Sequence, residues 1–94
     1  MRNERFEWDD EKAWLNRAKH KVSFERATAV FDDNNALNEA DDEPSEERWQ
    51  TIGFDAARIL VVIWTERRNN VIRIISARKA NRNEEDRYYR QASP

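Results

Sequence analysis

The chain has 94 residues, 38% of them charged, and a net charge of −2, which predicts one small domain over residues 1–94 and excludes indiscriminate nucleic-acid binding by bulk charge. The absence of cysteine excludes disulfides, thiolate metal sites and cysteine nucleophiles, and it favours a reducing, cytoplasmic location. The longest apolar run, residues 59–64, is far shorter than the roughly 20 residues of a membrane-spanning helix, so we expect no membrane partner.

The first third of the chain predicts a short strand followed by two helices. Residues 5–8 alternate as a strand would, and Asp9 follows as a helix N-cap. The first helix should end at Lys19 or His20, and Ser23 should cap a second helix that ends before the turn-forming residues 32–35. That second helix places four apolar side chains on one side: Phe24, Ala27, Val30 and Phe31.

The rest of the chain predicts strands and a final helix. We expect strands at residues 36–39, 48–54, 59–65 and 71–77, with Gly53 marking a bulge. Asn81 or Asn83 should begin the last helix. The order β-α-α-β-β-β-β-α predicts an α+β fold: an antiparallel sheet with two N-terminal helices on one face and a C-terminal helix, which leaves the other face free for function.

Charge is uneven along the chain. Residues 1–55 hold 8 Lys or Arg against 15 Asp or Glu, whereas residues 56–94 hold 9 against 4. The basic part can steer a phosphate chain to one face, and the acidic part can face a basic protein.

Several motifs follow one another along the chain: Phe6-Glu7-Trp8-Asp9, Lys19-His20, Val22-Ser23-Phe24-Glu25, Glu46-Glu47-Arg48-Trp49, and the run Ile-Arg-Ile-Ile-Ser-Ala-Arg-Lys-Ala at residues 72–80. Together, in this order, they resemble the BrnT family of toxins. The resemblance covers about residues 6–89. Lys21 stands where the family commonly has Gly, so a left-handed helix end there would carry a steric cost.

The resemblance implies a RelE-like ribonuclease fold and the toxin of a type II toxin–antitoxin pair. Such toxins arrest growth by cleaving RNA. The implied partner is a BrnA-type antitoxin with a ribbon-helix-helix DNA-binding region, and operator DNA would be contacted only through that antitoxin.

The strongest candidate site lies at residues 73–79. Arg73, Ser76, Arg78 and Lys79 occupy a strand that is otherwise apolar, and a guanidinium is rarely buried without an anion. In a regular strand Arg73 and Arg78 face opposite ways, so both line one groove only if a bulge or the strand end turns Arg78. The alternative for Arg73 is a cross-strand pair with Glu47. Arg78 and Lys79, next to Arg82, favour a phosphate cluster.

Two further stretches supply candidate groups. His20 is the only histidine and suits proton transfer near neutral pH, with Lys19 as a phosphate contact; alternatively, His20 caps the first helix. Glu47 is a candidate base, and Trp49 either stacks on an RNA base or belongs to the core.

Two more features concern substrate contact and metal binding. Tyr88 or Tyr89 in the last helix is a candidate substrate contact. Acidic residues 41–43 favour a solvated turn over a metal site, because Pro44 follows them.

These residues support two functional hypotheses. The first is a metal-independent endoribonuclease without a cofactor, in which Arg73 and Arg78 stabilise the phosphate, Lys19 assists, and Glu47 or His20 moves protons. The second is a non-catalytic binding module that acts as corepressor with its DNA-binding partner. A metal-dependent nuclease ranks third, because the sequence lacks a clustered set of carboxylates.

Overall fold

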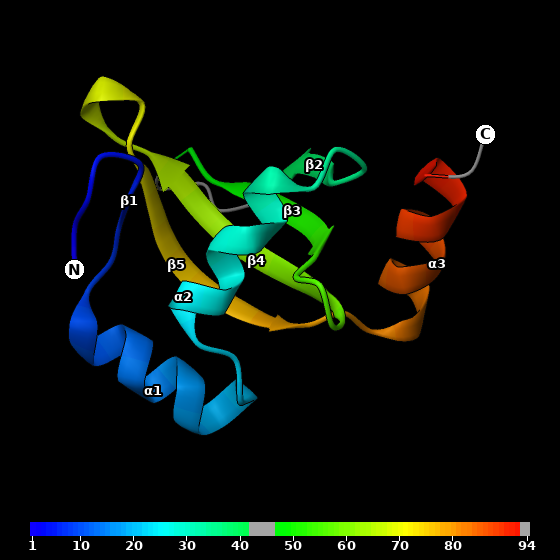
Figure 1. Cartoon of the computed structure of the whole chain (residues 1–94), viewed down its shortest axis with the longest axis horizontal. Coiled ribbons are helices and arrows are strands. Elements are labelled where there is room, and N and C mark those ends of the chain that lie inside the picture. Colours follow the sequence, from blue (N-terminus) through cyan, green and yellow to red (C-terminus); the bar gives the residue numbers. More distant parts are fainter. Residues whose placement is uncertain (42–46, 93–94) are drawn as a thin grey trace.

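A mixed β-sheet forms the centre of the computed structural model, which describes residues 1–41 and 47–92. The sheet of the described residues has five strands in the order β1-β5-β4-β3-β2 (Figure 1). Their bounds are β1 Phe6–Glu7, β2 Leu37–Ala40, β3 Trp49–Phe54, β4 Ile59–Glu66 and β5 Ile72–Lys79. Asp42, Glu43 and Glu46 lie outside the described residues.

The predicted antiparallel sheet is wrong at one edge. The strands β2 to β5 form an antiparallel meander, but β1 pairs with β5 in parallel, with Phe6 opposite Ile72 and Glu7 opposite Arg73. Hairpins force their strands to be antiparallel, whereas no short turn joins β1 to β5. Nothing local in the sequence therefore fixes the direction of β1.

Two predicted caps are confirmed at the helices on one face of the sheet. The Asp9 carboxylate accepts a hydrogen bond from the Lys12 amide at the start of α1 (Asp10–His20), and Ser23 accepts one from Arg26 at the start of α2 (Phe24–Ala27). The second helix is shorter than predicted, because the chain continues as the 3₁₀ helix η1 (Thr28–Asp32). The Thr28 hydroxyl donates to the Glu25 carbonyl three residues back at 2.7 Å, which suits that tighter winding.

The steric cost expected at Lys21 is present. Lys21 ends α1 in the left-handed conformation, with φ 61° and ψ 26°, and its amide donates to the Arg17 carbonyl at 2.9 Å. This conformation is unfavourable for a residue with a Cβ. The fold therefore holds a strained residue at this joint.

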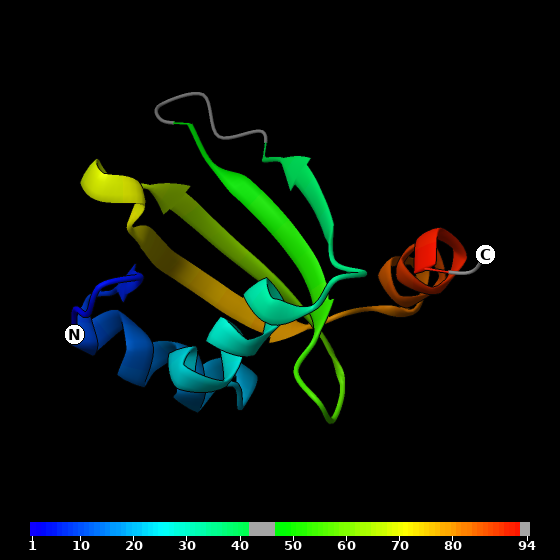
Figure 2. The ribbon, with the colours of Figure 1, turned by 45° about the horizontal axis from the view of Figure 1, so that its top comes forward.

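The sheet separates two apolar clusters. Figure 2 shows α1 and α2 beneath the sheet and α3 (Arg82–Ala92) beyond the end of β5. The cluster on the helix side contains Phe6, Trp8, Val22, Phe24, Ala27, Val30, Leu60, Val62, Ile74 and Ala77. The smaller cluster, under α3, contains Ile52, Ile59, Val61 and Tyr88. None of the helices in the described ranges has the length and apolar character needed to cross a bilayer.

Gly53 does not mark a bulge, because β3 and β4 pair without interruption around it. Its lack of a side chain serves the packing of η1 instead. A Cβ at this position would lie 2.8 Å from Val30 Cβ, closer than real contacts allow, and at a tight 3.3 Å from Val30 Cα. Gly53 therefore lets η1 approach the sheet.

A buried asparagine attaches α1 to β5. The Asn16 side-chain amide donates to the carbonyls of Val22 and Ala77 at 3.0 and 2.8 Å, and its oxygen accepts from the Ala77 amide at 3.2 Å. Because β1 covers only the beginning of β5, Asn16 satisfies the free strand edge further along.

Candidate functional site

A bulge in β5 brings three of the predicted site residues to one face of the sheet. Ser76 pairs with Ile63 and Ile74 with Trp64, so Ile75 is the extra residue. Arg73, Ser76 and Arg78 then lie opposite Thr65, Ile63 and Val61, which alternate along β4 and share one face. Val61 belongs to the cluster under α3, so this is the face opposite α1 and α2. The condition under which both arginines share a face is met.

Arg73 pairs with Glu7 and not with Glu47, which was the alternative considered for it. Arg73 Nη1 donates to the Glu7 carboxylate at 2.6 Å, because the parallel register places the two residues side by side. The Arg73 side chain is 32% exposed and that of Glu7 is 13% exposed. The hydrogen bond from Arg73 lowers the pKa of Glu7 against the opposing effect of burial, so its carboxylate stays charged.

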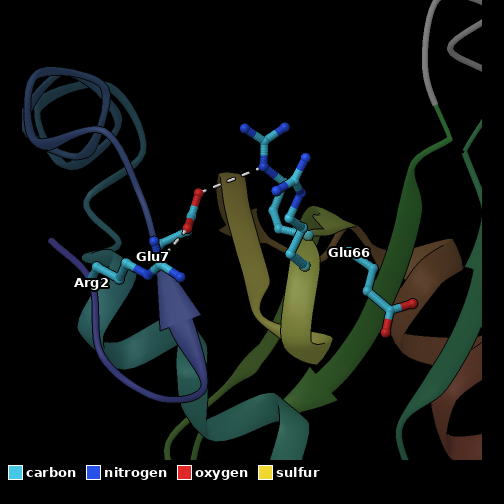
Figure 3. A pocket seen from close by; sticks show the side chains of 5 residues that line it. Arg2, Glu7 and Glu66 are labelled. Atoms are coloured by element: carbon cyan, nitrogen blue, oxygen red, sulfur yellow. Dashed lines mark ion pairs between the residues drawn. The ribbon is translucent and has the colours of Figure 1, made fainter.

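Two further guanidiniums approach the same carboxylate. Arg2 and Arg67 place their Nε atoms 3.8 and 3.7 Å from Glu7. Around them is a pocket of about 570 Å³, lined by Arg2, Glu7, Glu66, Arg67 and Arg68, which we term the arginine pocket. Figure 3 shows Glu7 facing into this pocket, with ion pairs on both sides, and Glu66 directed away from Glu7. Arg73 therefore has an internal counterion, yet it is partly exposed beside an open pocket.

Arg78 has a different environment at the other end of β5. Its two terminal nitrogens each donate to the Glu84 carboxylate at 2.8 Å. Glu84 also accepts from the Asn81 amide, and Asn81 accepts from the Glu84 amide, which is a capping box at the start of α3. The hydrogen bonds raise the pKa of Arg78 and lower that of Glu84. Arg78 thus anchors α3 to the sheet, and Ser76 lies half-buried between the two arginines.

Glu47 lies at the same end of the sheet as Arg73. Its carbonyl accepts the Thr65 hydroxyl at 2.6 Å, and Thr65 is the cross-strand neighbour of Arg73. Its exposed side chain lines a pocket of about 400 Å³ that shares Glu66 and Arg67 with the arginine pocket. Among the predicted proton-transfer groups, Glu47 is therefore the one near Arg73.

Trp49 lies on the helix face, away from Arg73. It pairs with Trp64, and the two rings stack with centroids 6.2 Å apart. Trp64 in turn packs edge-on against Phe31 and donates its indole N–H to the Thr51 hydroxyl at 2.7 Å. The placement agrees with Trp49 as a half-buried extension of the core.

Lys19 and His20 lie at the far end of β5 from Arg73. Asn16 binds Ala77, and His20 is one helical turn beyond Asn16. Neither side chain forms a hydrogen bond or ion pair with any residue in ranges 1–41 and 47–92. The Ala18 carbonyl in the last turn of α1 accepts from the Lys21 side chain at 3.2 Å, and the alternative in which the His20 side chain bonds the terminal carbonyls is not observed.

The three remaining candidate RNA contacts lie on different parts of the fold. Lys79 pairs with Leu60, which places it on the helix face, away from Arg78. Arg82 is exposed in the first turn of α3. Tyr88 is 6% exposed, and its hydroxyl donates to Asp33 at 2.7 Å. Burial and that hydrogen bond raise the pKa of Tyr88 to about 12, so it does not exchange a proton near neutral pH.

Comparisons with known proteins assign the chain to a family. Residues 8–84 match the family described as the ribonuclease toxin, BrnT, of type II toxin–antitoxin systems. The chain belongs to this family. The fold is similar to the 1.1 Å crystal structure of the Brucella abortus ribonuclease toxin, BrnT, with a TM-score of 0.65 and 23% identity over 83% of this chain and 97% of that one. No curated protein matches the chain significantly. The resemblance found in the sequence is confirmed.

Membership of the BrnT family implies an antitoxin partner. Among the described residues, no group of three or more His, Cys, Asp or Glu side chains has the geometry to hold a metal ion.

Sequence reasoning missed the arginine pocket. The sequence predicts only a strand and a family motif at Glu7, and it assigns no role to Arg67 or Arg68. The available signal was a pair of arginines directly after a buried strand, next to a strand that also carries an arginine. The involvement of Arg2 depends on the parallel edge strand, which no local pattern predicts.

Proposed function

We propose that this BrnT family member is an endoribonuclease that cleaves RNA without a metal ion, using Arg73 to stabilise the charge that develops on the phosphate. The observation that carries the proposal is the position of Arg73 on the sheet face opposite α1 and α2, at the other end of β5 from Arg78, which anchors α3. Only one of its nitrogens donates to Glu7, so the other guanidinium N–H groups have no partner within the described residues. Charge-assisted hydrogen bonds from such a cation are suited to a developing phosphorane.

The reaction needs two proton transfers. A base removes the 2′-OH proton, the 2′-oxygen attacks phosphorus, and the P–O5′ bond breaks as an acid protonates the leaving oxygen. We assign the base to Glu47, because it shares the end of the sheet with Arg73. His20 lies beyond Ala77, roughly 13 Å or more from Arg73 by strand geometry, which disfavours its action on the same bond.

The same geometry separates the two strand arginines. Five residues of β5 place the Arg73 and Arg78 backbones roughly 15 Å apart, so they do not stabilise one phosphate together. We propose that RNA runs along this face past Ser76, with Arg78 and Arg82 contacting phosphates distant from the cleaved bond. Lys19, Lys79, Trp49 and Tyr88 remain proposed contacts whose positions favour them less.

The cellular context follows from the family. We propose a RelE-like toxin that inhibits translation and growth and is neutralised by a BrnA-type, ribbon-helix-helix antitoxin through which it contacts operator DNA. The support is family membership, together with Arg73 and Arg78 on one sheet face, which suit contacts with phosphate.

The test uses purified protein without the antitoxin. RNA is incubated with it, with and without a chelator and with and without ribosomes, and the cleaved ends are mapped. We expect cleavage that the chelator does not change and 2′,3′-cyclic or 3′-phosphate ends. No cleavage under any condition favours the non-catalytic corepressor, and cleavage abolished by the chelator favours a metal-dependent nuclease.

A further inference from the structure

Four arginines meet at one end of the sheet around a single half-buried acid. Arg2 comes from the N-terminus, Arg67 and Arg68 from the connection between β4 and β5, and Arg73 from β5. Glu7 is the acid that Arg2, Arg67 and Arg73 all approach within 4 Å. Segments separated by more than 60 residues in sequence thus place cations at one point.

The connection between β4 and β5 holds two of these cations in place. Residues Arg68–Asn70 form the 3₁₀ turn η2, in which Asn69 and Asn70 both have φ 61°. Asparagine tolerates this left-handed conformation better than most residues. The Arg67 amide also donates to the Val71 carbonyl at 2.7 Å, which closes the turn. The turn therefore has a defined shape that presents Arg67 and Arg68 at the rim of the pocket.

The charges of the pocket do not cancel. Three arginines and two glutamates line it, and Arg73 adjoins it through Glu7. Glu66 is directed away from Glu7 and forms no ion pair within the described part of the chain. Arg2 and Arg67 are 65% and 55% exposed, so their guanidinium donors remain accessible at distances of 3.7–3.8 Å from Glu7. The pocket keeps a net positive charge and donors that Glu7 does not use.

We propose that the arginine pocket binds a phosphate group of single-stranded RNA, neighbouring the phosphodiester that Arg73 stabilises. This inference rests on the proposed ribonuclease function and names where part of the substrate lies. Planar guanidiniums match the non-bridging oxygens of a phosphate in pairs, which a point charge does not. Glu7 holds the arginines together in the absence of RNA, and Arg67 and Arg68 reach the phosphate from the open side. An acidic protein segment is the competing occupant, but the contact of Glu7 with Arg73 ties this pocket to the proposed cleavage site.

The experiment measures binding without chemistry. A fluorescent 2′-O-methyl RNA oligonucleotide cannot be cleaved, because it lacks the 2′-OH, and its anisotropy is titrated with the full chain at several salt concentrations. We expect Arg67→Ala and Arg68→Ala each to weaken binding by about threefold to tenfold, and each to reduce the salt slope by about 0.7, the value for one contact to a single strand. Glu66→Gln removes a negative charge from the rim, so it should tighten binding by about twofold to fivefold.

Matched controls on α3 separate a local effect from net charge. Arg90→Ala and Glu85→Gln change the same charges at exposed positions of another element, and both should leave binding within about twofold of the unchanged protein. All of these residues are exposed, so melting temperatures should stay the same. The proposal is overturned if a protein carrying both Arg67→Ala and Arg68→Ala binds RNA as tightly as Arg90→Ala does, with an unchanged salt dependence. It is also overturned if poly-L-glutamate displaces the labelled RNA more effectively than unlabelled RNA does. Binding through the pocket without cleavage of ordinary RNA would instead remove the ribonuclease proposal and keep the pocket.

Discussion

Replacing Arg78 with Ala should destabilise the protein far more than replacing Arg73 with Ala, although both arginines pair with a glutamate. Arg78→Ala removes two hydrogen bonds of 2.8 Å from Glu84. The Glu84 side chain is 10% exposed, and no second arginine pairs with it among the described residues. Arg73→Ala removes one bond of 2.6 Å from Glu7, but Arg2 and Arg67 still lie within 4 Å.

The magnitudes follow from these environments. Breaking a buried pair costs about 3–5 kcal/mol of unfolding free energy, and the 38% exposure of Arg78 reduces the expected cost to about 2–3 kcal/mol. For Arg73→Ala we expect about 1 kcal/mol or less, because Glu7 keeps two cations. In a domain of this size, 1 kcal/mol shifts the melting temperature by roughly 4–8 °C. Arg78→Ala should therefore melt roughly 10–20 °C lower.

Urea unfolding followed by circular dichroism measures both variants, with Arg90→Ala as an exposed control on α3. Glu84→Gln should reproduce the loss of Arg78→Ala, because both open the same pair. A loss below 1 kcal/mol for Arg78→Ala, or an equal loss for Arg73→Ala, would refute the assignment of Arg78 as the anchor of α3.

Three further predictions concern stability. Lys21→Gly should raise the unfolding free energy by about 0.5–1 kcal/mol, because glycine adopts φ 61° without strain; a lower urea midpoint would contradict this. Gly53→Ala should lower it by about 1–3 kcal/mol through the clash with Val30, whereas Ala56→Gly, at φ 80°, should not destabilise. Burial would raise the pKa of Asp55, but backbone amides and Arg26 outweigh it and lower that pKa from 3.8. The stabilisation is therefore present above about pH 4 and lost as pH falls through the lowered pKa. The unfolding free energy of Asp55→Asn should therefore decrease less steeply with falling pH than that of the unchanged protein. An equal dependence on pH in the two proteins would show that Asp55 is not involved.

The local structure was predictable because it depends on neighbours in sequence. Asp9 and Ser23 cap their helices through amides three residues away, and the apolar run at residues 59–64 is the buried β4. The left-handed end at Lys21 was expected from the helix boundary and from the family resemblance.

The site depended on long-range geometry that no local pattern contains. The extra residue Ile75 is hidden in an apolar run, yet it decides that Arg73 and Arg78 share a face. The counterion of Arg73 is 66 residues away in an edge strand whose direction no turn fixes. Gly53 resembled a bulge because its partner Val30 lies in another element. In each case the position of the residue depends on which distant elements pair or pack together, and no local sequence pattern specifies that pairing.

The decisive measurement is single-turnover RNA cleavage by Arg73→Ala in the presence of a chelator, beside the unchanged protein and Arg73→Lys. If Arg73 stabilises the transition state, the alanine variant should cleave about 10²-fold or more slowly while melting no more than roughly 8 °C below the unchanged protein, and lysine should restore only part of the rate. Cleavage by a folded Arg73→Ala protein at the unchanged rate would contradict the assignment of Arg73 to the reaction.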